Sequence, residues 1–245
     1  MYVLNMAEMA ETIVHPYYPQ SLRFQQYAAN EWSVSQLIGA FAAGWIVILG
    51  IASAITRRQN PNLRGSEQVL VLWFVLTGLI HCFFEGYFVY NHASMPARRD
   101  FFGQLWKEYA LSDSRYMSAD PLVLVMESWT VAIWGPLSLL TAVLITQDSA
   151  YRYPVQALVS TGHIYGNLLY FSTSLYEEYA AGTRYYRPEP FYFWVYFVAM
   201  NAVWFVVPGW CLYGSVTETA RAVGMARRVV GILDASKHAA TKKRL

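Results

Sequence analysis

The sequence predicts an all-α integral membrane protein with five transmembrane helices and a pocket between them. Of its 245 residues, 56% are hydrophobic and only 14% are charged, whereas an average soluble domain carries about 25% charged residues. Several apolar segments are long enough for a helix to cross a bilayer core, which takes roughly 20 residues. In addition, a few ionisable side chains lie inside these segments, where they are costly unless they are paired or functional.

The apolar segments indicate five spans in order along the chain. They are Ser33–Thr56, Gln68–Tyr90, Pro121–Thr146, Pro154–Tyr176 and Pro190–Gly214. The first and the fifth contain no charged residue, and the fifth is strongly aromatic. The fourth is the weakest, because it is rich in Gly, Ser and Tyr and contains His163.

These spans divide the chain into an N-terminal segment (1–32), a five-span domain (33–214) and a basic tail (215–245). With the tail in the cytoplasm, eleven Lys and Arg residues outside the spans lie on the cytoplasmic side and seven on the other. Cytoplasmic loops carry an excess of Lys and Arg. We therefore expect an exposed, helical, cytoplasmic C-terminal end.

The chain ends in Lys242-Lys243-Arg244-Leu245. Lysines third and fourth from a cytoplasmic C-terminus resemble the dilysine signal for retrieval to the endoplasmic reticulum. The alternative is a basic tail that only follows the orientation rule.

Between the second and third expected spans, aromatic and aliphatic residues recur near helical spacing. Phe102, Leu105, Trp106 and Tyr109 follow this spacing, while Lys107 lies off the apolar stripe. This pattern is typical of a short amphipathic helix on the membrane face. Such a helix would cap a pocket between the spans or simply connect them.

The polar residues inside the spans form pairs that each share a helix face. His81 and Glu85 lie four residues apart, whereas Glu127 and Thr130 lie three apart on the next span. Asn201 and Trp204 share a face of the fifth span in the same way. At about 1.5 Å per residue, these groups fall into one layer of an antiparallel bundle.

A simpler interpretation is that the His–Glu pair satisfies itself and holds helices together. His163 is expected to be such a packing residue. The sequence contains no phosphate-binding loop, no Ser-His-Asp order, no Cys cluster and no ligand set for a catalytic metal. A net charge of only +2 also argues against a nucleic-acid partner.

The buried groups therefore predict an enzyme that transfers protons to and from a neutral lipid. Burial disfavours the charged forms of a carboxyl and an imidazole, so that both can exchange protons near neutral pH. If a protonated alkene became a carbocation, carboxylates and aromatic faces would stabilise it. Trp204, Trp129 and nearby tyrosines such as Tyr165 are suitable for this role.

Six segments carry a resemblance to a known family. They are HPYYPQSLRF, LTGLIHCFFEGYFV, QLWKEYALSDSRY, MESWTVAIWGPLSL, GHIYGNLLYF and YFWVYFVAMNAVWFVVPG, in this order. Together they resemble the emopamil-binding protein family, the sterol Δ8–Δ7 isomerases, which contain an EXPERA-like domain. The resemblance covers most of the chain.

This resemblance implies a five-helix membrane fold and a sterol pocket that is open toward the bilayer. It further implies a homodimer in the endoplasmic reticulum membrane. In the implied reaction, a Δ8-sterol is protonated at carbon 9, a cation forms at carbon 8, and a proton leaves carbon 7. No cofactor or metal is implied, and cationic amphiphilic amines are expected to bind the same pocket.

The resemblance also assigns residues. His81, Glu85 and Glu127 match catalytic positions, with Glu85 and His81 expected to transfer protons and Glu127 to stabilise the cation. The expected substrate-binding residues are Thr130, Asn201, Trp204, Tyr109, Tyr116, Tyr165 and Trp129. Of these, Tyr109 and Tyr116 match loop tyrosines that cap the pocket, and Thr130 and Asn201 are expected to orient the catalytic groups.

Three other functions stay open. One is a family member that acts on another triterpenoid or terpenoid with the same acid–base set. Alternatively, the chain is a non-catalytic membrane protein that binds sterols or drugs. A proton or ion pathway ranks last, because only one polar layer is present rather than a whole pore.

Overall fold

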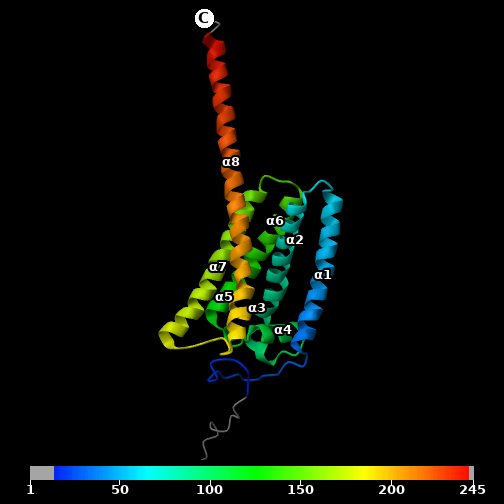
Figure 1. Ribbon diagram of the computed structural model, residues 1–245, viewed down its shortest axis with the longest axis vertical. Coiled ribbons are helices and arrows are strands. Elements are labelled where there is room, and N and C mark those ends of the chain that lie inside the picture. Colours follow the sequence, from blue (N-terminus) through cyan, green and yellow to red (C-terminus); the bar gives the residue numbers. More distant parts are fainter. Residues whose placement is uncertain (1–13, 243–245) are drawn as a thin grey trace, which may run out of the picture.

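The computed structural model describes residues 14–242, without the side chains of residues 237 and 239–242. Within that range the protein is all-helical and contains no strand. Its α-helices are α1 (Val34–Gln59), α2 (Gly65–Leu79), α3 (Gly86–Asn91), α4 (Phe101–Tyr109), α5 (Pro121–Trp129), α6 (Gly135–Thr146), α7 (Arg152–Ala181) and α8 (Met200–Lys242). The long helices run side by side as a bundle, and α8 extends well beyond it (Figure 1).

Three of the long apolar segments each contain a stretch of π-helix. Ile80–Glu85 joins α2 to α3, Thr130–Trp134 joins α5 to α6, and Tyr192–Ala199 leads into α8. A π-turn adds a residue to the helical turn and changes the direction of the side chains, and such turns are frequent at functional sites. Among the residues predicted for the site, His81, Glu85 and Thr130 lie inside these stretches, and Glu127, Trp129 and Asn201 lie within three residues of one.

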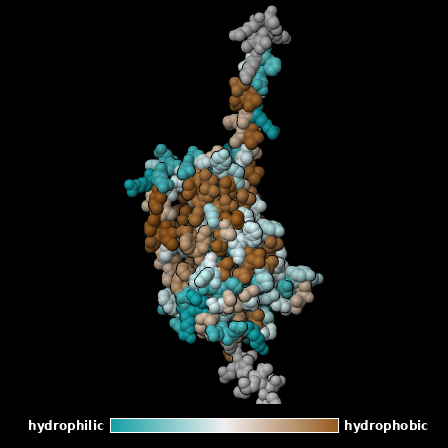
Figure 2. All heavy atoms as spheres, turned by 180° about the vertical axis from the view of Figure 1, so that it is seen from behind, coloured by the Kyte–Doolittle hydropathy of each residue, from teal (hydrophilic) through white to brown (hydrophobic). Residues whose placement is uncertain are grey.

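Within residues 14–242, four helical segments are long and apolar enough to cross a membrane. They are Val34–Gln59, Gly65–Ala97, Pro121–Thr146 and Tyr192–Ser236. Apolar side chains gather over the middle of the bundle, whereas hydrophilic ones gather toward its two ends (Figure 2). These features indicate a multi-pass membrane protein.

Helix α7 is not among these four segments, although its 30 residues form an unbroken helix packed against α6 and α8. At about 1.5 Å per residue, it is roughly 45 Å long. Its buried face carries polar side chains every three or four residues, at Gln156, Ser160, His163, Asn167, Tyr170 and Ser174. This buried polar stripe explains why the fourth span is the weakest in the sequence.

The short helix α4 forms where the amphipathic pattern predicts one, and Asp100 caps its first turn by accepting from the backbone N–H of Gly103. The helix does not present a polar face to solvent, because Lys107 is only 2% exposed. The N-terminal segment covers it, and the Lys107 ammonium donates to the carbonyl of Ala28. In addition, the Tyr17 hydroxyl donates to the Lys107 carbonyl.

The apolar core forms two separate clusters. One lies under α4 and includes Phe88, Trp106 and Phe197, while the other includes Phe74 and Val159 nearer the opposite end of the bundle. The predicted catalytic residues lie between the two clusters. The bundle therefore encloses a polar layer between apolar cores.

The tail is helical and exposed over residues 219–236, as expected, and it is continuous with the last span across residue 215. Residues 14–32 lie at the α4 end of the bundle, whereas α8 leaves from the other end (Figure 1). The Lys242-Lys243 motif lies outside the described residues, apart from the backbone of Lys242.

Candidate functional site

A cavity of about 510 Å³ lies in the polar layer of the bundle. Every residue predicted for the site lines it: His81, Glu85, Glu127, Thr130, Asn201, Trp204, Tyr109, Tyr116, Tyr165 and Trp129. Trp129 on α5 and Tyr165 on α7 are each 61% exposed. The cavity thus reaches the outer surface between these two helices.

His81 and Glu85 lie at the two ends of the first π-helical stretch, Ile80–Glu85. The imidazole Nδ1 of His81 is 2.7 Å from Oε2 of Glu85, and both side chains are largely buried. Their four-residue spacing therefore produces the expected contact. The Trp204 ring lies against His81, with 5.1 Å between the ring centroids and an interplanar angle of 32°.

The other imidazole nitrogen of His81 contacts a residue that the sequence did not single out for function. Its Nε2 is 3.0 Å from Nε2 of His163, which lies on α7. His163 is buried and lines the cavity. The only signal in the sequence was a further ionisable side chain within an expected span, besides His81, Glu85 and Glu127, and no spacing linked α7 to the second span.

Glu127 is buried at the end of α5 and accepts a hydrogen bond from the Tyr116 hydroxyl, at 2.6 Å to Oε1. Helix α4 and the loop that follows it form the cap of the cavity, which they line with Trp106, Tyr109 and Tyr116. The bond from Tyr116 therefore connects this cap to the third span. Burial, and next the nearby Glu127, raise the pKa of Tyr116 well above its ordinary value. The tyrosine is therefore a neutral donor to Glu127 at physiological pH.

Asn201 joins the cap to two helices. Its side-chain oxygen accepts from the Tyr109 hydroxyl at 3.2 Å, and its amide nitrogen donates to the carbonyl of Phe197. In turn, the Asn167 side chain on α7 donates to the Asn201 carbonyl. Burial raises the pKa of Tyr109 above its usual range, so this hydroxyl also stays protonated.

Thr130 and Asn201 were expected to orient the catalytic groups, but the hydrogen bonds to Glu127 and His81 come from other residues. The Thr130 hydroxyl donates to the carbonyl of Met126 in its own helix, and Asn201 bonds the groups named above. Tyr116 holds Glu127, and His163 contacts His81. The arrangement places two carboxyl groups and an imidazole at one cavity wall, where they can give and take protons beside aromatic rings.

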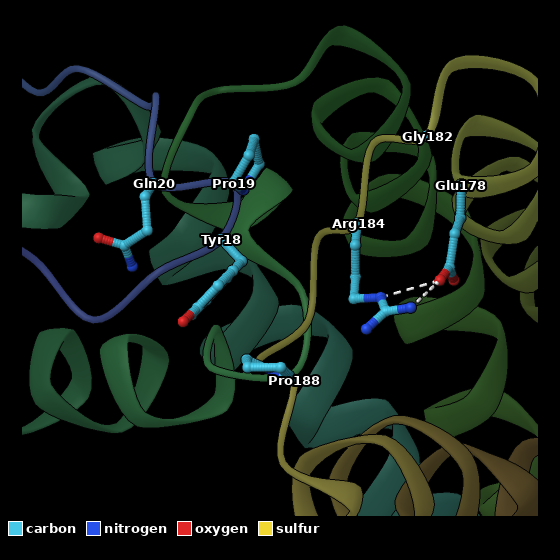
Figure 3. Close-up of a pocket in the computed structure, with 7 residues that line it drawn as sticks. All are labelled: Tyr18, Pro19, Gln20, Glu178, Gly182, Arg184 and Pro188. Carbon is cyan, nitrogen blue, oxygen red and sulfur yellow. Dashed lines mark hydrogen bonds and ion pairs between the residues drawn. The ribbon is translucent and has the colours of Figure 1, made fainter.

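No group of three His, Cys, Asp or Glu side chains among the described residues is arranged to hold a metal ion. A second, open cavity of about 520 Å³ lies outside the bundle, between Tyr18–Gln20 and the segment around Glu178–Pro188 (Figure 3). Arg184 and Glu178 form an ion pair on its wall. None of the predicted site residues lines it.

Comparison with known proteins identifies the family. The model of EXPERA, the expanded EBP superfamily, matches residues 101–215. A 3-beta-hydroxysteroid-Delta(8),Delta(7)-isomerase of Rattus norvegicus is 34% identical over 215 residues, which are 86% of this chain and 91% of the relative. The protein of the same name from Mus musculus is 37% identical and covers 80% and 84%. An isomeliandiol synthase of Melia azedarach is 33% identical and covers 76% and 82%.

The matched region contains Tyr116, Glu127, His163 and Asn201, and the longer matches to the isomerases extend over most of the chain. The resemblance to the emopamil-binding proteins is therefore confirmed. The chain belongs to the EXPERA family, the expanded EBP superfamily.

Proposed function

We propose that this protein is a sterol isomerase that moves a ring double bond from the Δ8 to the Δ7 position. The observation that carries the proposal is the meeting of Glu85, His81 and Glu127 at one wall of an aromatic-lined cavity. Relatives named for this reaction cover most of the chain at 34–37% identity. The cavity chemistry supports proton transfer, and the relatives' names support this particular reaction.

In the proposed reaction, a proton is added to carbon 9 of the Δ8 alkene, which leaves a cation at carbon 8. A proton then leaves carbon 7, and its bonding electrons form the new double bond between carbons 7 and 8. Glu85, assisted by His81, is placed to transfer these protons. Glu127 lines the same cavity as Glu85 and would stabilise the cation by charge.

The substrate would be a sterol that enters from the bilayer. The exposed rim at Trp129 and Tyr165 supports a lateral entrance within the apolar part of the bundle. Trp204 lines the cavity and would present its ring to the cationic centre. Because an ammonium group mimics that centre, we expect cationic amphiphilic amines to compete with the sterol.

The proposed topology has five membrane crossings, with α7 as the fourth. The length of α7 and its packing against α6 and α8 support a crossing whose polar face is turned inward. Five crossings also agree with the N-terminal segment and the tail lying at opposite ends of the bundle (Figure 1). The excess of Lys and Arg on the tail side then favours a cytoplasmic C-terminus.

We propose that the protein resides in the endoplasmic reticulum membrane, and substitution of Lys242 and Lys243 tests whether these lysines contribute to that location. In a tagged protein, Lys242→Ala together with Lys243→Ala should allow transport out of this compartment, which microscopy would follow. Unchanged retention would show that these lysines do not contribute. The homodimer implied by the resemblance stays a prediction, and the mass of the detergent-solubilised protein would test it.

The function is tested by expressing the chain in cells that lack their own isomerase and supplying a Δ8-sterol. Gas chromatography of the sterol extract should show the Δ7 product. Glu85→Gln, Glu127→Gln and His81→Ala should abolish it while the protein remains folded in the membrane. Full activity of both Gln variants as purified proteins would contradict the mechanism.

A second candidate is isomerisation or rearrangement of another terpenoid. It is favoured by relatives with other names, namely the isomeliandiol synthase of Melia azedarach and a protoglabretal synthase of Citrus sinensis, each 33% identical. The same acid–base groups would serve this reaction. If the folded protein forms no Δ7-sterol, triterpenoid alcohols are the next substrates to assay. If it binds sterols or triterpenoids but converts neither, it is better explained as a non-catalytic sterol-binding protein.

A further inference from the structure

His163 has no role in the reaction proposed above, yet it contacts a catalytic residue directly. Nε2 of His163 lies 3.0 Å from Nε2 of His81, and the two ring centroids are 4.9 Å apart. Both rings are more than nine-tenths buried. Since they come from α7 and from the second span, the contact depends on the packing of the bundle.

Two imidazole nitrogens at this distance share one proton. One nitrogen must carry N–H and the other a lone pair, because two lone pairs repel and two N–H groups cannot bond to each other. Nδ1 of His81 is already engaged with the Glu85 carboxyl at 2.7 Å. Proton positions on Glu85, His81 and His163 are therefore linked in one chain of contacts.

The nitrogen at the His163 end of these contacts indicates which group donates each hydrogen bond. Nδ1 of His163 is buried, and none of the described protein groups is within hydrogen-bond distance of it. A buried N–H without an acceptor is rarer in proteins than an acceptor with an unused lone pair. The arrangement that avoids a buried, unpaired N–H puts the lone pair on Nδ1 of His163 and the proton on its Nε2.

The remaining protons follow from this assignment. His163 donates its Nε2–H to Nε2 of His81, so His81 carries its own proton on Nδ1 and donates it to Glu85. Glu85 is then a carboxylate that accepts this bond. An imidazolium at His81, or a protonated Glu85 that donates to His81, would make His81 the donor to Nε2 of His163. The proton of His163 would then lie on its Nδ1, where it has no acceptor among the described protein groups.

We propose that His163 is a positioning residue for the isomerase reaction, which holds His81 in the Nδ1–H tautomer and thereby keeps Glu85 ready to accept a proton. This inference rests on the proposed function and refines its roles. The Glu85 carboxylate accepts the proton from carbon 7. Instead of Glu85 transferring both protons, Glu127, which lines the same cavity, donates the proton to carbon 9 and becomes the carboxylate that stabilises the cation. Glu85 returns the proton from carbon 7 to Glu127 after the product has formed.

Nitrogen NMR of ¹⁵N-histidine-labelled protein in lipid nanodiscs tests the tautomer without any assay of activity. His81→Ala and His163→Gln assign the signals among the five histidines of the chain. We expect His81 to be protonated at Nδ1 and unprotonated at Nε2, with a coupling across the bond between the two Nε2 atoms. A His81 protonated at Nε2 would overturn the proposal.

Activity variants test the positioning role. His163→Gln keeps an N–H donor and should retain activity within about threefold, whereas His163→Leu removes the donor from a buried group and should lower kcat by about tenfold or more. KM should change little, because His163 acts through His81. Thr161→Val, on the same helix but exposed, is the matched control.

The outcomes distinguish the two proposals. If His163→Leu remains folded and as active as wild type, or if His163→Gln is impaired as strongly as His163→Leu, His163 is not a positioning residue. Gel filtration and thermal unfolding in detergent report whether the His163→Leu variant is folded. If this variant does not fold, the tautomer of His81 in the wild-type protein decides whether the inference holds. Absence of sterol turnover by wild type would contradict the isomerase proposal and leave the tautomer measurement valid.

Discussion

The hydroxyl of Tyr116 donates a 2.6 Å hydrogen bond to the carboxyl of Glu127, so that a loop outside the spans holds a buried acid inside one. Tyr116 is itself packed between Trp106 of α4 and Tyr109, with ring centroids 4.8 and 5.4 Å away. The cap of the cavity therefore does more than connect two spans. It determines where one of the two carboxyl groups points.

Tyr116→Phe should retain the aromatic packing and lose only this hydrogen bond. A hydrogen bond between neutral groups contributes about 0.5–1.5 kcal/mol, so we expect kcat on a Δ8-sterol to fall by about twofold to tenfold, with only a small drop in the melting temperature. Tyr90→Phe, which alters a tyrosine that is 88% exposed, should leave turnover unchanged. Equal turnover by both variants would show that Tyr116 does not orient Glu127.

Asp113→Asn should destabilise the protein strongly. Asp113 and Arg115 form an ion pair beneath the cap with side chains 0% and 2% exposed, and the Arg115 guanidinium also bonds the Thr173 hydroxyl and the Tyr170 carbonyl. Removing one partner leaves a buried charge uncompensated, which costs about 3–5 kcal/mol. Thermal unfolding in detergent would measure the loss.

The control for this prediction is Glu218→Gln on the exposed part of α8. Glu218 pairs with Arg221, but both side chains are exposed, so the pair contributes about 0–1 kcal/mol. Its melting temperature should match wild type. A similar small effect of Asp113→Asn would mean that the buried pair does not stabilise the cap.

Gly135→Ala should impair both stability and turnover. A Cβ at this position would lie 2.6 Å from the Cys82 sulfur and 3.2 Å from both the Cys82 backbone nitrogen and Cβ of His81. The added methyl group would push apart the two π-helical stretches that carry the site, and such overpacking costs typically about 1–3 kcal/mol.

Gly209→Ala is the matched substitution, because it adds a methyl group to a helix where nothing lies within 4 Å. Alanine is intrinsically favoured over glycine in a helix by roughly 0.5–1 kcal/mol, so this variant should be as stable as wild type or slightly more stable. Melting temperature and sterol turnover of both variants would be compared. If Gly135→Ala behaves like Gly209→Ala, the close approach of the two spans is not required.

Lys107 predicts a pH dependence of stability. Burial, and next the charge of Arg99, lower the pKa of Lys107 to about 8 in the folded protein, whereas an unfolded lysine has a pKa of 10.5. Between these two values the unfolded chain binds the proton more tightly. Raising the pH from about 8 toward 10 therefore shifts the equilibrium toward the folded state at this residue.

Lys107→Met isolates this contribution. The difference in melting temperature between wild type and Lys107→Met should move in favour of wild type as the pH rises from 8 to 10. The difference is needed because tyrosines titrate in the same range and affect both proteins alike. A difference that is constant with pH would show that Lys107 keeps its ordinary pKa in the folded state.

Much of the site could be predicted from the sequence because it depends on local spacing. His81 and Glu85 lie four residues apart on one helix, so the helical period alone brings them together. Glu127 and Asn201 stood out as polar residues in apolar segments. The helix at Phe101–Tyr109 followed from the amphipathic pattern that precedes the third span.

The contacts between helices could not be predicted in this way. The approach of His163 to His81, and of Tyr116 to Glu127, joins segments whose relative rotation is not encoded by any spacing. The π-helical stretches add a further change in side-chain direction that regular helical periodicity does not contain. The burial of Lys107 likewise required the N-terminal segment to fold over α4.

The sequence by itself determined that the chain is an all-helical membrane protein of this family, with carboxyl groups and an imidazole in an apolar layer. It did so because the cost of burying polar groups and the helical period act on neighbouring residues. The tertiary structure alone decided which side chains hold the two catalytic carboxyl groups and the imidazole. Those partners come from different helices, and only the packing of the bundle brings their atoms within hydrogen-bond distance.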